Sequence, residues 1–155
     1  MGIALATALL AVLAADPAPE PTPGPTHVVF VCEHGSVKSV IAMAWFERLA
    51  RERGLDLRAV SRGMTPDAAV PAAIADRLRQ DGFDLGQFQP SAFSKQDLEG
   101  AGRVVAIGVD TASVSAASSV PVEVWDDIPS ATQHYDQARD ALRARIEALL
   151  ATLRK

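Results

Sequence analysis

The stretch that decides the fold runs from His27 to Ser39 and reads HVVFVCEHGSVKS. Its opening segment, HVVFVC, is nearly all apolar, which is typical of a strand buried on both faces of a parallel sheet. A short glycine-containing loop follows, and the apolar spacing that begins at Ser39 predicts a helix. A loop that passes directly into a helix directs backbone N–H groups and the positive end of the helix dipole toward one point. The stretch therefore predicts an anion site beside Cys32, whose thiol becomes a better nucleophile in such a field.

The rest of the chain alternates between strand and helix patterns. We expect further strands over 57–61, 103–109 and 120–125, and helices over 39–53 and 71–80, over a short segment opened by Ser94 and Asp97, and from Tyr135 onward. Such alternation implies a parallel sheet with helices on both faces, whose ligand site lies beyond the carboxyl ends of the strands. Cys32 ends the first strand, and Asp126 and Asp127 follow the fourth. We therefore expect these three residues at the same edge of the sheet.

Composition narrows the class of protein. The 155 residues suit one domain, and a hydrophobic share of 48% is enough for an ordinary core. The net charge of −4 argues against general nucleic-acid binding. One cysteine excludes both an intramolecular disulfide and a multi-cysteine zinc site, and the three histidines lack metal-ligand spacing. We therefore predict no metal and no cofactor.

The N-terminal region differs from the rest. Residues 1–15 have the apolar run and the small residues of a signal peptide, and 16–26 form a proline-rich linker before a domain over 27–155. We expect an exported protein, periplasmic or secreted, with no stable membrane insertion after signal cleavage. The alternative is a cytoplasmic protein whose start codon is mis-assigned.

The motif at Cys32 resembles that of a known family. Val-Phe-Val-Cys, five intervening residues, a cation and Ser39 are similar to the active-site loop of the low-molecular-weight protein tyrosine phosphatases and of the arsenate reductases that share their fold. The step Ser61-Arg62-Gly63 and the late acidic pair lie where that family has comparable features. The resemblance implies a three-layer α/β/α fold with a four-stranded parallel sheet, phosphotyrosine protein phosphatase I-like and flavodoxin-like.

The resemblance also implies roles for the loop residues. Cys32 is the expected nucleophile, Lys38 supplies positive charge, and Ser39 hydrogen-bonds the thiolate. The oxyanion is expected to bind to the backbone N–H groups of Glu33, His34, Gly35, Ser36, Val37 and Lys38. His34 is otherwise a solvated loop residue.

The chain departs from the family pattern at three places. Lys38 replaces the usual arginine, so a compact ammonium charge stands where the family has a planar guanidinium that binds two oxygens at once. Gly35 replaces the usual asparagine, and both residue types tolerate positive φ. The late loop, Trp125 to Ser130, contains no Asp-Pro pair of the kind that supplies the family's general acid, so Asp127 or Asp126 takes that role, or Ser130 occupies the position and the acid is missing.

Three functions are consistent with these residues. The first is a phosphatase-like hydrolase that acts on phosphotyrosine or another phosphomonoester through a phosphocysteine intermediate, with a phosphorylated protein or a small phosphomonoester as its partner. The second is a thiol-dependent arsenate reductase. The third is an oxyanion- or partner-binding protein with little or no turnover.

Overall fold

The computed structural model describes residues 27–153; the predicted signal peptide and linker lie outside this range. Its elements follow in the order β1 (His27–Cys32), α1 (Lys38–Glu52), β2 (Arg58–Gly63), α2 (Ala72–Gln80), the short 3-10 helix η1 (Lys95–Leu98), β3 (Ala101–Ile107), α3 (Thr111–Ala117), β4 (Val122–Trp125) and α4 (Tyr135–Thr152). Within this range no helix combines the length and apolar character needed to cross a membrane.

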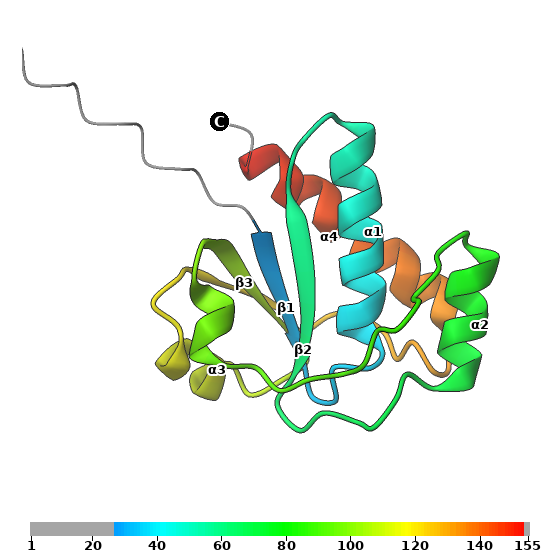
Figure 1. Ribbon diagram of the computed structural model, residues 1–155, viewed down its shortest axis with the longest axis horizontal. Coiled ribbons are helices and arrows are strands. Elements are labelled where there is room, and N and C mark those ends of the chain that lie inside the picture. Colours follow the sequence, from blue (N-terminus) through cyan, green and yellow to red (C-terminus); the bar gives the residue numbers. More distant parts are fainter. Residues whose placement is uncertain (1–26, 154–155) are drawn as a thin grey trace, which may run out of the picture.

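The four strands form one parallel sheet in the order β2-β1-β3-β4, which confirms the predicted fold class. β1 lies between β2 and β3 and has a hydrophobic core on each face, so its residues from Val28 to Cys32 are buried, as the apolar run predicts. Phe30 points into the core that α1 and α4 cover, whereas Val29 and Val31 point into the smaller core beneath α3. Figure 1 shows the resulting layers, with α1 and α4 on one side of the sheet and α3 on the other.

Most element boundaries agree with the sequence pattern to within about two residues. The predicted cap at η1 is present, because the Ser94 backbone N–H donates to Asp97 Oδ2 at 2.8 Å. The helix α3 was not predicted. Its sequence, TASVSAA, buries only Val114 and therefore has no apolar stripe. Instead Asp110 begins the helix by accepting a hydrogen bond from the backbone N–H of Ala112 at 3.1 Å.

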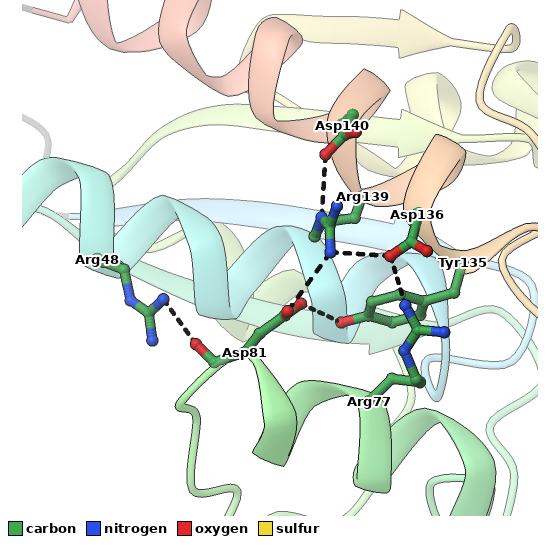
Figure 2. A network of polar contacts seen from close by, with 7 residues as sticks. All are labelled: Arg48, Arg77, Asp81, Tyr135, Asp136, Arg139 and Asp140. Atoms are coloured by element: carbon green, nitrogen blue, oxygen red, sulfur yellow. Dashed lines mark hydrogen bonds and ion pairs between the residues drawn. The ribbon is translucent and has the colours of Figure 1, made fainter.

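A polar network fastens α2 to α4 (Figure 2). The Tyr135 hydroxyl donates to Asp81 Oδ2 at 2.8 Å, and Arg139 forms ion pairs with Asp81 at 3.4 Å and with Asp136 at 2.9 Å. Arg77 of α2 also pairs with Asp136. Burial and the neighbouring Asp81 carboxylate raise the pKa of the Tyr135 hydroxyl above its ordinary value. The network therefore holds α2 against α4, and at its centre the neutral phenol of Tyr135 donates a hydrogen bond to the Asp81 carboxylate.

Candidate active site

The loop after β1 turns its carbonyl groups away from its own centre. The carbonyls of Cys32, Glu33 and His34 accept hydrogen bonds from backbone N–H groups of the 64–67 segment, at 3.1, 2.8 and 3.0 Å. In a trans peptide the next N–H group points opposite to the carbonyl. The N–H groups of residues 33–35 therefore point into the loop, and the first N–H groups of α1, which begins at Lys38, add to them. This arrangement is an anion cradle at the end of β1.

Gly35 brings the loop into contact with the end of β2. Its φ is +62°, which suits glycine, and a Cβ built on it would lie 2.7 Å from the backbone nitrogen of Gly63. A Cβ on Gly63 would likewise meet the Gly35 nitrogen at 2.7 Å. Tolerance of positive φ alone is thus not enough at position 35. In this chain an asparagine there also requires the Gly63 backbone to move.

Two buried serines stand behind the Cys32 thiol. Cys32 Sγ lies 3.0 Å from Ser39 Oγ, and the Ser61 hydroxyl donates to Ser39 Oγ at 2.7 Å. A thiolate can only accept, so Ser39 donates to Cys32 once the thiol is ionised, and Ser61 orients Ser39 for that bond. Ser39 does not cap α1 with its side chain. Sequence reasoning gave Ser61 no role; the available signal was its place near the end of a strand beside β1, in register with Phe30.

The side chains of the first loop residues bind the neighbouring 64–67 segment. The Thr65 hydroxyl donates to Glu33 Oε1 at 3.2 Å, and His34 donates from Nδ1 to the Thr65 carbonyl at 3.2 Å. The buried Ser36 hydroxyl donates to Asp67 Oδ2 at 2.6 Å, and His34 lies 3.6 Å from the same carboxylate. These contacts fix the loop from outside and leave its backbone N–H groups for an anion.

Lys38 links the loop to the segment after β4. Its Nζ donates to the carbonyl of Ile128 at 2.8 Å. A Cβ built on Gly108, which follows β3, would lie 3.6 Å from the same nitrogen. The ammonium therefore stands between the ends of three strands, at the edge of the sheet where the pattern places a ligand.

These elements enclose a pocket of about 200 Å³. It is lined by Cys32, Glu33, His34, Val37, Lys38, Ile107, Gly108, Ser130, Ala131 and Thr132. A larger groove of about 370 Å³ lies between α1 and the 82–88 turn, and its lining contains no cysteine, serine or threonine, whereas Cys32 lines the smaller pocket. Of the ten predicted site residues, the structure brings Cys32, Glu33, His34, Val37 and Lys38 to the pocket wall. Gly35 and Ser36 lie in the loop behind it, and Ser39 lies in the first turn of α1.

The two late aspartates are placed elsewhere. Asp127 Oδ2 pairs with Arg145 of α4 at 2.6 Å, and this hydrogen bond lowers the pKa of the exposed Asp127 carboxyl. Neither Asp126 nor Asp127 lines the pocket, although both follow β4 at the expected edge. Ser130, the alternative at this position, does line it. The assignment of the general acid thus stays a prediction. Between residues 27 and 153 no group of three or more His, Cys, Asp or Glu side chains could hold a metal ion.

Known proteins resemble the chain in sequence and in fold. The family model described as "Low molecular weight phosphotyrosine protein phosphatase" matches residues 27–155. A Halobacterium salinarum protein, provisionally named an arsenate reductase, is 27% identical over 126 residues, which cover 80% of this chain and 87% of that protein.

Solved structures share the fold. A low molecular weight protein tyrosine phosphatase from T. tengcongensis has a TM-score of 0.70 at 20% identity, covering 83% of this chain and 99% of that one. A thioredoxin-dependent arsenate reductase from Corynebacterium glutamicum has a TM-score of 0.67 at 16% identity, covering 86% of this chain and 64% of that one. Since the family model spans the whole described part, the chain belongs to the low molecular weight phosphotyrosine protein phosphatase family, an enzyme family whose members include phosphatases and arsenate reductases.

Proposed function

We propose that this protein hydrolyses phosphomonoesters with Cys32 as the nucleophile. One observation carries the proposal: a buried thiol, backed by the hydroxyl of Ser39 at 3.0 Å, faces a loop whose N–H groups converge on the adjoining pocket. A cradle of N–H groups stabilises the charge that develops on equatorial phosphoryl oxygens. Lys38 at the pocket wall adds a positive charge to the cradle. Phosphotyrosine is one member of the proposed substrate class.

The proposed reaction has two steps. In the first, the Cys32 thiolate attacks phosphorus, the S–P bond forms, and the P–O bond to the leaving group breaks with its electron pair passing to that oxygen. In the second, water attacks phosphorus, the S–P bond breaks, phosphate leaves and the thiolate is regenerated. Ser39 stabilises the thiolate before the first step and after the second, because it donates a hydrogen bond to sulfur.

Hydrolysis of 4-nitrophenyl phosphate by the purified protein tests this proposal. We expect activity in the wild type, none in Cys32→Ser, and a phosphorylated Cys32 in the quenched wild type by mass spectrometry. Thermal unfolding of Cys32→Ser checks that the variant is folded. A wild type that is inactive toward several aryl phosphates from about pH 5 to 8 would refute the proposal. Phosphate binding without turnover in the same assay would favour the oxyanion-binding alternative.

Arsenate reduction is the second candidate, favoured by the Halobacterium salinarum relative. Cys32 would form an S–As bond with arsenate as water leaves. The chain contains one cysteine, so an external thiol must attack the Cys32 sulfur, form a mixed disulfide and release arsenite. A second thiol then regenerates Cys32, and the two thiols together supply the two electrons. Arsenite formation that depends on added glutathione, measured beside phosphatase activity, separates the two candidates.

We also propose that the domain works outside the cytoplasm. The support is the apolar run and the proline-rich linker before His27. Cell fractionation and N-terminal sequencing of the native protein test it. A cytoplasmic product that begins at Met1 would refute export.

A further inference from the structure

The loop after β4 forms one wall of the pocket, and this wall carries hydroxyl groups. Ser130, Ala131 and Thr132 line the pocket together with Cys32 and Lys38. Ser130 Oγ lies 3.1 Å from Thr132 Oγ1, so the two hydroxyls hydrogen-bond to each other. Aliphatic hydroxyls are not among the side chains that act as general acids near neutral pH. These two hydroxyls therefore supply no acidic proton at this wall of the pocket.

The nearby carboxylates are directed elsewhere. Asp127 pairs with Arg145 of α4 at 2.6 Å and does not line the pocket, and this hydrogen bond lowers the pKa of the Asp127 carboxyl. Asp126 is exposed and does not line the pocket. On the opposite side, Glu33 accepts a hydrogen bond from Thr65, and His34 donates its Nδ1 proton to the Thr65 carbonyl. These hydrogen bonds hold both side chains to the 64–67 segment, so Glu33 and His34 line the pocket on the side opposite the hydroxyl groups.

We propose that the substrates are phosphate esters and anhydrides whose leaving group departs as a stable anion: acyl phosphates and electron-poor aryl phosphates. The inference rests on the proposed phosphatase function. The transition state of phosphoryl transfer is loose, so the leaving oxygen carries most of its negative charge before the bond is fully broken. In this proposal the leaving group lies against the wall formed by residues 130–132, which supplies no acidic proton, so only a leaving group that stabilises this charge by itself departs quickly.

The first step balances without a proton from the protein. The S–P bond to Cys32 forms, the bond between phosphorus and the leaving oxygen breaks, and both electrons of that bond stay on the leaving carboxylate or phenolate. After its release, the carboxylate or phenolate takes up a proton from water to the extent that its own pKa sets. The second step is common to all these substrates, because each gives the same phosphocysteine. The choice of leaving group therefore always appears in kcat/KM, which reports the first irreversible step, and it appears in kcat only where that first step limits turnover.

The test compares kcat/KM for acetyl phosphate, 4-nitrophenyl phosphate and phenyl phosphate on the full chain. We expect wild-type kcat/KM to fall by about 10²- to 10⁴-fold from 4-nitrophenyl to phenyl phosphate, the factor that a general acid commonly contributes. Ser130→Asp places a carboxyl group at the pocket wall and is expected to reduce this ratio. Ser119→Asp makes the same change at an exposed position between α3 and β4, and is expected to leave the ratio as it is.

Each outcome of the test decides the inference. A wild-type ratio below about tenfold would overturn it, because some group in the protein then donates the proton; Asp127→Asn and His34→Gln would identify that group by raising the ratio. The wild-type ratio does not depend on whether Ser130→Asp folds. A protein that hydrolyses none of the three substrates refutes the proposed function itself, whereas hydrolysis with a small ratio refutes only the inference on substrate class.

Discussion

The contact between the active-site loop and β2 predicts different outcomes for two Gly→Ala substitutions that share one backbone conformation. Gly35 has φ +62° and Gly54 has φ +68°, so an alanine at either position adopts left-handed backbone geometry. A Cβ at position 35 would lie 2.7 Å from the Gly63 nitrogen and 3.0 Å from the Arg62 carbonyl carbon. A Cβ at position 54 would meet nothing within 4 Å. Gly54→Ala is therefore a matched control that contains the strain without the overlap.

The magnitude follows from these two contributions. Left-handed geometry costs an alanine about 1–2 kcal/mol, and the smaller entropy of the unfolded chain returns about 0.4–1 kcal/mol. Gly54→Ala is therefore expected to lower the free energy of unfolding by about 1 kcal/mol. Gly35→Ala adds an overlap with backbone that cannot rotate away, and such overpacking costs about 1–3 kcal/mol. The two variants are expected to differ in stability by about that last amount.

Urea unfolding of both variants and of the wild type measures the difference, and 4-nitrophenyl phosphate hydrolysis measures its effect on the site. We expect Gly35→Ala to lose most activity because the N–H groups of the cradle move with the loop, whereas Gly54→Ala keeps it. Equal stability and equal activity of the two variants would refute the argument from the close approach of Gly35 and Gly63.

Three more predictions concern the site and the network around α2. Lys38→Arg is expected to raise kcat several-fold for 4-nitrophenyl phosphate, because a guanidinium binds two oxygens at once; an unchanged or lower kcat would contradict this. Ser61→Ala removes the donor to Ser39 and is expected to lower kcat by about tenfold with little change in KM. If KM rises instead and kcat stays, Ser61 acts on substrate binding. Tyr135→Phe is expected to lower the free energy of unfolding by about 1–2 kcal/mol at neutral pH, because Asp81 loses a donor. Because the pKa of the Tyr135 hydroxyl is raised, this contribution is present below the ordinary phenol pKa of about 10 and is lost at higher pH, so urea unfolding should show the two proteins converging in strongly alkaline solution.

The part of the site that could be predicted is continuous in sequence. The strand β1, the loop and the start of α1 follow one another without interruption, so their geometry depends on local pattern. An apolar run ended by Cys32 predicts a buried strand, and the glycine-containing loop before a helix predicts the cradle. Spacing alone predicted the capping box at Ser94 for the same reason.

The part that could not be predicted depends on contacts between distant segments. The bond from Ser61 to Ser39 joins positions that meet only because β2 lies beside β1 in a particular register. The close approach of Gly35 and Gly63 has the same origin. Likewise α3 has one buried residue, so its stability comes from a cap and from the sheet beneath it rather than from a periodic pattern.

The late loop illustrates how burial decides which side chains reach the pocket. Trp125, Ile128 and Ala131 are buried and recur at every third position, so they anchor the segment to the core. Asp126 and Asp127 lie between the first two anchors and are exposed, whereas Ser130 and Thr132 flank the last anchor at the pocket wall. The spacing of the buried anchors thus accounts for the presence of Ser130 at the pocket wall, while the role of the aspartates stays a prediction.

Lys38 connects this loop to the chemistry. Its Nζ donates to the carbonyl of Ile128, the middle anchor, at 2.8 Å, while the same ammonium lines the pocket. An oxyanion that enters the cradle is therefore a second acceptor for the three protons of Lys38, beside the backbone carbonyl. Since a lysine side chain is flexible and can donate to both acceptors at once, the bond to the loop need not break when the anion binds. With lysine in place of arginine, the chain thus lacks the two parallel hydrogen bonds that a guanidinium makes to the anion. It keeps one positive charge, which lies between the substrate site and the loop that carries the hydroxyl groups.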